Sequence, residues 1–264
     1  RAALADASAE TLRAYADAAA GRVEVRTETL FGVAFIEVIR AVARGGHDLV
    51  VKAAHAPETT ARRLFGSLDM HLLRKCPVPL WLVKPAAAHP HRRVLAAVDF
   101  DRDADEGDAD SLNRRIAEAA AAQALADFAE LHVVHVWQPA YEGILRSRGV
   151  FAAENEAQRY VEAERAWHRR ALDGLGNRMR GWLGEEAYAY LQPRLHLRQG
   201  NAGAVIPELA GELGADLVVM GTVGRTGIAG LLIGNTAETI LDGIDASVLA
   251  IKPPGFRTPV QAEG

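Results

Sequence analysis

The stretch Asp216-Leu-Val-Val-Met220, continuing as Gly221-Thr-Val-Gly224-Arg-Thr-Gly227-Ile-Ala-Gly230-Leu-Leu-Ile-Gly234-Asn235-Thr236, decides how the rest of the chain is interpreted. Its apolar start predicts a buried parallel strand. Five glycines within the next fourteen residues are poor helix material, so the strand must end in a loop. Asn235 or Thr236 can then cap a helix that begins at about Ala237.

A strand, a glycine-rich loop and a helix N-terminus in this order predict a site for an anion. Loop glycines let backbone N–H groups approach a bound group closely, and the helix dipole and its free N–H groups favour a phosphate. The loop is not a Walker A loop, because no Gly-Lys-Ser/Thr closes it. The glycines alone leave an alternative open, a βα turn that serves only tight packing.

The chain repeats itself at a shift of 168 residues (216 against 48). The segments that align are Asp48-Leu-Val-Val51 with Asp216-Leu-Val-Val219, Gly66 with Gly234, and Lys84-Pro85 with Lys252-Pro253. A period of this length indicates duplicated domains rather than a solenoid. We predict an N-terminally truncated unit at 1–85, a complete unit at 92–254 and a tail at 255–264.

Strands and helices alternate in both units. For the first unit the pattern predicts helices at 8–20, around 33–42 and at 67–75, and strands at 23–28, 48–52 and 79–83. For the second unit it predicts strands at 93–99, 131–136, 194–198, 216–220 and 247–251, and helices at 114–125, 153–184, around 205–213 and at 236–242. Apolar strands that alternate with helices predict an α/β fold, with a parallel sheet covered on both faces.

Composition limits the function classes. With 264 residues, 49% of them hydrophobic, the chain can form two domains, and its net charge of −4 predicts no general attraction to nucleic acid. The single cysteine, Cys76, excludes an internal disulfide, fits a reducing compartment and is interpreted as a buried structural thiol. No apolar run approaches the roughly 20 residues that span a bilayer, so we predict a soluble, cytoplasmic protein without a membrane partner.

Both halves resemble the universal stress protein family, particularly its tandem bacterial E-type members. The resemblance is carried by Gly45-Gly-His-Asp-Leu-Val50, Asp69-Met-His-Leu-Leu-Arg-Lys-Cys-Pro77, Gly221-Thr-Val-Gly-Arg-Thr-Gly-Ile228, Gly234-Asn-Thr-Ala-Glu238 and Thr258-Pro-Val260. The spacing Gly221-x2-Gly224-x9-Gly234 is similar to the family's ATP-binding signature. The family usually has Ser or Thr after the last glycine, whereas this chain has Asn235, whose amide can still donate to a phosphate oxygen.

The resemblance implies two tandem doubly wound parallel five-stranded sheets of strand order 3-2-1-4-5, the first one incomplete. The two units are expected to pair through their last strands within one chain, and a homodimer stays open. The first unit lacks the segments that match 93–136, and together with the start at Arg1 this is interpreted as the start of a truncated chain. Strand 23–28 would then be detached, so we expect residues 1–85 alone to be unstable and residues 92–264 to fold independently.

The resemblance also implies an adenine nucleotide site at the carboxyl ends of the strands, where the strand order reverses. The implied ligand-binding residues are Ala97, Val98 and Asp99 for the adenine; Val136 beside it; Met220, Gly221, Thr222, Val223 and Gly224 along ribose and phosphates; Arg225, Thr226 and Gly227 over them; and Gly234, Asn235, Thr236 and Ala237 at the helix start. For Asp99 a plain role as a strand-end acid that caps the next turn is the alternative.

The first unit departs from this pattern in its loop, residues 52–67. Alanines replace two glycines, Pro57 removes a donor, and Glu58 would repel a phosphate. Only Gly66-Ser67 survives, so the first unit is predicted to be the nucleotide-free structural mate of the second.

Other chemistry finds little support in the sequence. His132 and His135 lie three apart in a strand and point to opposite faces, so no metal site is predicted. The acidic run Asp101, Asp103, Asp105, Glu106, Asp108 and Asp110 is where an Mg²⁺ ion accompanying ATP could be approached, but a solvated loop is favoured. No catalytic residue can be assigned, although slow ATP hydrolysis stays open. The rival hypotheses are a dimerisation or small-ligand-binding module without nucleotide, and an adenylate-handling enzyme on the same fold.

Overall fold

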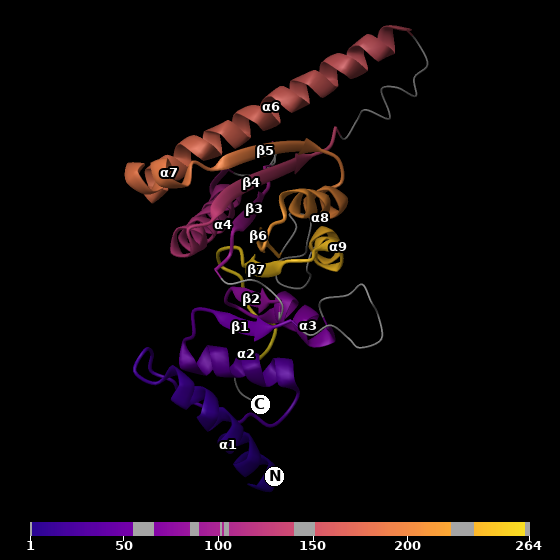
Figure 1. The fold of residues 1–264 in the computed structure, drawn as a ribbon. Coiled ribbons are helices and arrows are strands. Elements are labelled where there is room, and N and C mark those ends of the chain that lie inside the picture. The colour runs from indigo at the N-terminus through magenta and orange to yellow at the C-terminus, as the bar shows by residue number, and fades with distance from the viewer. Residues whose placement is uncertain are drawn as a thin grey trace.

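A computed structural model describes residues 2–54, 66–84, 90–100, 102, 106–139, 151–222 and 235–261 (Figure 1). Its helices are α1 (Ala2–Ala19), α2 (Ala34–Gly45), α3 (Ser67–Lys75), α4 (Glu106–Asp127), α6 (Phe151–Leu183), α7 (Glu185–Leu191), α8 (Ala202–Leu213) and α9 (Asn235–Gly243). Its strands are β1 (Val50–Ala53), β2 (Leu80–Val83), β3 (Arg93–Val98), β4 (Glu130–Trp137), β5 (Arg194–Gln199), β6 (Leu217–Gly221) and β7 (Ser247–Ile251).

The strands form one seven-stranded sheet of order β1-β2-β7-β6-β3-β4-β5. Within the second unit the order β5-β4-β3-β6-β7 is the predicted 3-2-1-4-5, and all of its neighbours are parallel. The strands β1 and β2 are the last two of the incomplete first unit. They continue the sheet because β2 pairs with β7, and this pair is antiparallel. The predicted fold class is therefore confirmed.

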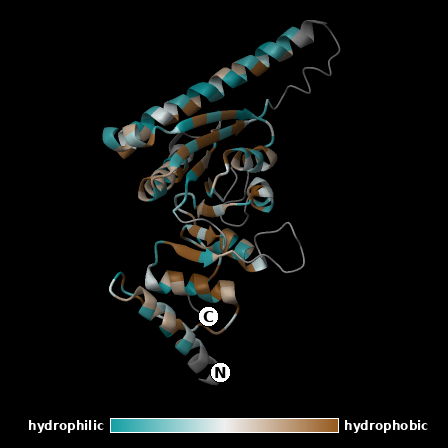
Figure 2. Ribbon diagram, in the orientation of Figure 1, coloured by the Kyte–Doolittle hydropathy of each residue, from teal (hydrophilic) through white to brown (hydrophobic). Residues whose placement is uncertain are grey.

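Two hydrophobic cores lie on the two faces of the sheet. Alternate residues of β6 enter different cores: Val218 and Met220 pack with α8 and α9, whereas Leu217 and Val219 pack with α4 and α6. Strands that are buried on both faces must be apolar throughout, which explains the continuous apolar runs in the sequence. The long helix α6, in contrast, is mostly hydrophilic along its length (Figure 2).

The predicted strand at 23–28 is wrong. Residues 2–49, all of which the structure describes, contain no strand, and Val23 has 64% of its surface exposed. In the second unit the corresponding strand, β5, pairs with β4 alone. Because residues 2–49 supply no counterpart of β4, segment 23–28 has no backbone to pair with, and an isolated strand is not stable in water.

Most other predicted elements are present with small shifts at their ends, but α1 and α4 begin six and eight residues before their predicted starts. Glu106, Asp108 and Asp110 therefore lie in a helix and not in the predicted loop. The helix over 67–75 and the strand over 247–251 have the predicted bounds. The predicted helix over 153–184 is α6, but an additional short helix, α7, follows it. Gly184 lies between the two with a φ of 83°, a conformation that other residues rarely adopt, and this allows the chain to change direction there.

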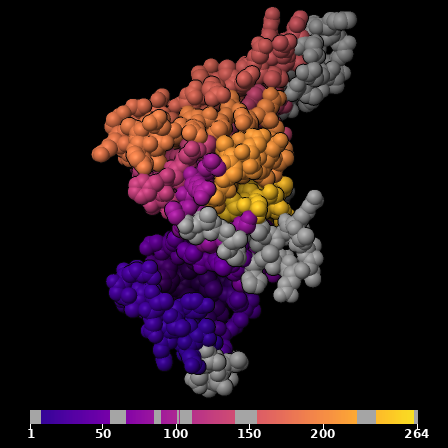
Figure 3. Space-filling model, in the orientation of Figure 1, coloured from indigo at the N-terminus to yellow at the C-terminus, as the bar shows by residue number. Residues whose placement is uncertain are grey.

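The two units meet along β2 and β7, where Leu80 lies opposite Ala250. In Figure 3 the first unit, in indigo, forms the lower lobe beneath the larger second unit. Polar contacts flank the paired strands: Arg74 Nε donates to Glu238 Oε1 at 3.0 Å. The side chain of Lys252 crosses from the second unit and donates to a main-chain carbonyl of α3.

Two further sequence predictions can be compared with the structure. Cys76 is buried as predicted, and burial raises the pKa of its thiol. Of the helices that the structure describes, none combines the length and the apolar character needed to cross a membrane.

Candidate functional site

The candidate site lies at the carboxyl ends of β3 and β6, the central strands of the second unit. The chain continues from β3 to β4 on one side, whereas β6 flanks β3 on the other side, so the strand order reverses here. Doubly wound sheets leave a crevice at such a point. The register places Ala97 beside Met220 and Val98 beside His135. The predicted segments 97–99, 136 and 220–222 therefore reach the same edge of the sheet.

Asp99 is the first residue beyond β3 and lies at this carboxyl edge of the sheet. Its side chain is 68% exposed, and its Oδ1 lies 3.9 Å from Nδ1 of His135. The main chain of Asp99 is held by Asn113 of α4: the Asp99 N–H donates to Asn113 Oδ1 (3.1 Å) and Asn113 Nδ2 donates to the Asp99 carbonyl (2.7 Å). An exposed carboxylate on a fixed main chain suits a ligand-binding role and also the alternative of a strand-end acid.

Three residues at the end of β6 border the same edge. Met220 is buried, and at Gly221 a Cβ atom would lie 3.2 Å from Cδ2 of Leu112, so close packing against α4 favours glycine here. Thr222 is 2% exposed, and its hydroxyl has no hydrogen-bond partner among the described residues. A buried hydroxyl without a partner is costly unless something satisfies it. A partner for this hydroxyl would have to come from outside the described residues.

The helix that follows the loop begins at Asn235, close to the predicted start. Ala237 is buried and Thr236 is exposed in its first turn. The loop itself lies outside the described residues, and with it the predicted positions Val223, Gly224, Arg225, Thr226, Gly227 and Gly234, as well as the side chain of Asn235. The structure thus places the two ends of the predicted phosphate loop.

A pair of histidines that was not predicted as part of the site lies behind Asp99. His135 is buried, its Nδ1 lies 3.3 Å from the Val98 carbonyl, and its Nε2 lies 2.8 Å from Nδ1 of His168 on α6. Because a carbonyl only accepts, the proton of neutral His135 is on Nδ1, and His168 donates to Nε2. Burial lowers the pKa of His135 to about 4, and burial also lowers the pKa of His168.

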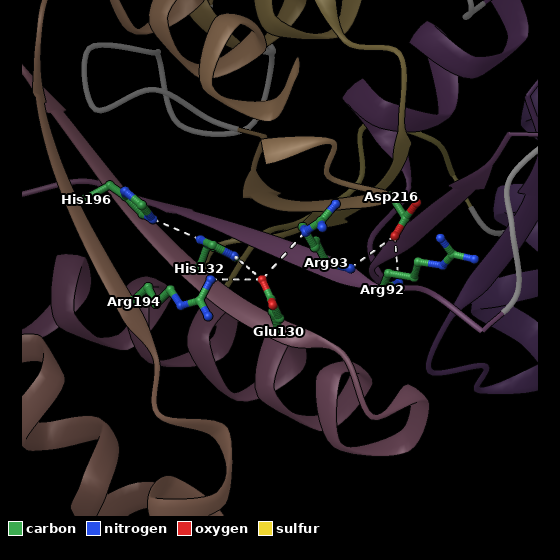
Figure 4. Close-up of polar contacts among 7 residues, drawn as sticks. All are labelled: Arg92, Arg93, Glu130, His132, Arg194, His196 and Asp216. Atoms are coloured by element: carbon green, nitrogen blue, oxygen red, sulfur yellow. Dashed lines mark hydrogen bonds and ion pairs between the residues drawn. The ribbon is translucent and has the colours of Figure 1, made fainter. Parts of the chain in front are cut away.

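The opposite edge of the sheet, at the amino ends of the strands, is tied by carboxylates (Figure 4). Asp216 accepts the main-chain N–H groups of Arg92 and Arg93 at 2.6 and 3.0 Å. Glu130 lies 2.9 Å from the guanidinium of Arg194 and 3.6 Å from that of Arg93. These contacts join the starts of four strands, so we interpret this network as structural.

His132 belongs to the same network. Its Nε2 lies 3.3 Å from Glu130, and its Nδ1 lies 2.9 Å from Nε2 of His196 on β5. The hydrogen bond from His132 is the main cause that lowers the pKa of Glu130. As predicted for residues three apart in a strand, His132 and His135 contact different partners. Within the described ranges no three potential metal ligands gather.

In the first unit two charged side chains that have no counterpart in the second unit form an ion pair at the equivalent positions. Lys52 corresponds to Met220 (52 + 168 = 220) and Asp69 to Ala237 (69 + 168 = 237). The ammonium of Lys52 lies 2.6 Å from the fully buried carboxylate of Asp69, which also accepts the N–H of Gly66 at 2.8 Å. A carboxylate of the protein thus occupies the N-terminus of α3, where an anionic ligand would otherwise be favoured.

The fold and site define a class of protein: a tandem doubly wound α/β protein with one candidate ligand site. This site lies at the switch point, the place between β3 and β6 where the strand order reverses. The model of the universal stress protein family matches residues 1–84 and 90–252. The chain therefore belongs to the universal stress protein family, and with it to the proteins of the stress response.

Individual relatives agree with this assignment. The chain is 33% identical over 230 residues to universal stress protein E of Escherichia coli (strain K12), covering 87% of this chain and 68% of that protein. It is 31% identical over 212 residues to the universal stress protein E homolog of Haemophilus influenzae, covering 80% and 64%.

Solved structures show the same architecture. A putative universal stress protein from Pseudomonas aeruginosa UCBPP-PA14 superimposes with a TM-score of 0.62 at 27% identity, over 96% of this chain and 78% of that chain. A universal stress protein from Archaeoglobus fulgidus DSM 4304 has a TM-score of 0.62 at 19% identity, over 94% and 79%, and shows the fold alone.

Proposed function

We propose that the second unit binds ATP or a related adenine nucleotide, and that the bound nucleotide serves a regulatory or protective role in the stress response. The observation that carries the proposal is the meeting of three features at the switch point. These are the exposed carboxylate of Asp99, the buried hydroxyl of Thr222 and the start of α9 at Asn235. Between the last two lies a loop with the glycine spacing of an ATP-binding signature.

The two ends of the nucleotide are proposed to bind at different elements. Asp99, at the end of β3, faces the adenine, whose amino group can donate to a carboxylate. Thr222 and the N-terminus of α9 lie at the two ends of the loop that holds the phosphates. Backbone N–H groups and a helix dipole favour a polyphosphate without any side-chain cation.

The first unit is proposed to bind no nucleotide. The buried carboxylate of Asp69 already accepts from Gly66 at the N-terminus of α3, and it pairs with Lys52. A phosphate at this place would meet a fixed negative charge at close range. The first unit therefore acts as the partner that covers the edge of β7.

The ligand is proposed to be bound rather than rapidly turned over. The described residues at the switch point offer His135 as a titratable group, but burial keeps it neutral and both of its ring nitrogens are engaged. Asp99 is a proposed ligand-binding acid, and a role for Mg²⁺ rests on the acidic residues that follow it in the sequence. A cytoplasmic location stays a proposal based on the single, buried cysteine.

Calorimetric titration of the full chain with ATP tests the proposal. We expect one binding site per chain, and we expect Gly224→Val to abolish binding, because a side chain there would obstruct the close approach of the backbone to the phosphates. The matched control is Ala56→Val, the same new side chain at the equivalent place of the first unit (56 + 168 = 224). It is expected to leave binding unchanged. No heat with the wild-type chain at millimolar ATP would contradict the proposal, and a retained non-nucleotide mass in native mass spectrometry would favour the small-ligand alternative.

A further inference from the structure

The main chain loses its regular hydrogen bonding where β3 ends. The register of β3 with β6 stops at Ala97, and the register with β4 stops at Val98. Asp99 is the next residue and pairs with neither strand. Its N–H and carbonyl therefore need hydrogen-bond partners at the carboxyl edge of the sheet.

Asn113 supplies both partners. It lies on α4, it is 3% exposed, and its amide accepts from the Asp99 N–H and donates to the Asp99 carbonyl at 3.1 and 2.7 Å. A side-chain amide has the same donor and acceptor as a peptide group, so Asn113 takes the place of a neighbouring strand. The buried side chain of Asn113 thus holds the main chain of Asp99, one residue beyond the end of β3, as a neighbouring strand would.

A second contact holds the residue before it. His135 donates to the Val98 carbonyl from β4, at 3.3 Å. His168 of α6 fixes the ring of His135 through its other nitrogen, and Phe100 packs edge-on against that ring at 4.8 Å between centroids. Residues 98 and 99 are therefore held between α4 on one side and β4 with α6 on the other.

We propose that Asn113 is a positioning residue of the nucleotide site, one that fixes Asp99 for contact with the base. The inference rests on the proposed function, and it goes beyond it by assigning a residue that touches no ligand. Because Asn113 acts only on the strand end, it serves the base end of the nucleotide and not the phosphate end.

This division gives a measurement that separates positioning from general stability. The ligands to compare are ATP, which needs both ends of the site, and inorganic tripolyphosphate, which needs only the loop and α9. For Asn113→Leu in the full chain we expect a loss of ATP affinity of about tenfold, the size of one or two hydrogen bonds to a buried main chain. The affinity for tripolyphosphate is expected to stay unchanged.

The matched control is Gln123→Leu on the same helix. Gln123 Nε2 donates to Asp127 Oδ2 at 2.7 Å, so the variant also removes an amide hydrogen bond from α4, but near the amino ends of the strands. It is expected to leave both affinities unchanged. Asn113→Asp keeps the acceptor for the Asp99 N–H but places a carboxylate oxygen opposite the Asp99 carbonyl and a charge at a buried position, so it is expected to weaken ATP at least as much as Asn113→Leu.

Hydrogen exchange of the Asp99 amide adds a readout without ligand, because this amide should lose protection in Asn113→Leu and keep it in Gln123→Leu. Equal affinities of Asn113→Leu and the wild-type chain for ATP would overturn the inference. So would a parallel loss for ATP and tripolyphosphate. A wild-type chain that binds no ATP would instead remove the proposed function, and the two failures are told apart by that first titration.

Discussion

Replacing Lys252 with methionine is expected to change how the stability of the protein depends on pH. Lys252 follows β7, is 1% exposed and donates from Nζ to the carbonyl of Leu73 in α3, with the ring of Phe256 4.6 Å away. In a helix the Leu73 carbonyl would accept from the N–H of residue 77, but that residue is Pro77 and has none. Lys252 of the second unit therefore satisfies a carbonyl of the first.

The magnitude follows from the pKa of this lysine. Burial lowers the pKa of Lys252 from 10.5 to about 8. Between these two values the unfolded chain keeps the proton that the native protein has released, so the free energy of unfolding rises with pH. The full shift corresponds to about 3 kcal/mol, of which about 1.4 kcal/mol is gained between pH 7 and pH 9. The neutral amine still donates to Leu73, so deprotonation keeps the hydrogen bond.

The assay is denaturant unfolding of the full chain at pH 7, 8 and 9, for the wild-type protein and Lys252→Met. The variant removes a buried charge but leaves the Leu73 carbonyl without a donor, which costs about 1–3 kcal/mol. We therefore expect similar stability at pH 7 and an advantage for the wild-type protein that grows towards pH 9. Subtracting the two curves removes the contribution of the other titrating groups.

Ile240→Val controls for reduced stability as such, because this buried residue carries no titratable group. Its cost of about 1 kcal/mol should be the same at each pH. If Lys252→Met and the wild-type protein show parallel pH profiles, Lys252 does not release its proton in this range, and the reasoning from its burial is refuted.

Three further predictions concern other parts of the molecule. Burial lowers the pKa of His135 to about 4, so the native protein keeps it neutral while the unfolded chain takes up a proton near pH 6.5. The free energy of unfolding should thus fall by up to about 3 kcal/mol as the pH falls from about 6.5 to 4. In denaturant titrations at pH 7, 6 and 5, His135→Phe should lose less stability than the wild-type protein. Parallel losses would contradict a neutral His135. Residues 92–264 alone expose the apolar edge of β7, so they should form a dimer by light scattering, whereas a monomer at micromolar concentration would show that this edge does not need a partner. Asp69→Ala removes the carboxylate that pairs with the ammonium of Lys52 and should cost about 3 kcal/mol in denaturant unfolding. Adding Lys52→Met gives both positions the residues of the second unit and should recover most of this loss. Additive losses would argue against the ion pair between Lys52 and Asp69.

Much of the fold could be predicted from local patterns in the sequence. Apolar runs bounded by glycine and proline mark strands wherever the chain is buried on both faces, and β7 has the predicted bounds for this reason. The repeat at a shift of 168 residues indicates two related units from the sequence alone. The glycine spacing from Gly221 to Gly234 predicts a phosphate site, because it reflects a requirement of the backbone itself, and this site is part of the proposed function.

The candidate site was predictable only in part, because some of its members act through residues distant in the sequence. Asp99 could be singled out as an acid at the end of a strand. Asn113 could not, since one asparagine in an alanine-rich helix gives no signal until the helix is packed against that strand end. His135 and His168 likewise become a pair only when α6 lies across β4.

The sequence by itself determined which segments are buried, where they turn and that the chain is duplicated, because hydrophobic periodicity and backbone freedom are properties of neighbouring residues. Only the tertiary structure decided which segments find partners. Residues 23–28 have the composition of a strand but remain irregular because no neighbouring strand pairs with them. Lys252 is an ionisable residue that is nevertheless buried, because it donates to a main-chain carbonyl of the other unit. Hydrogen bonds and ion pairs between distant residues depend on where the fold places both groups, and no local pattern contains that information.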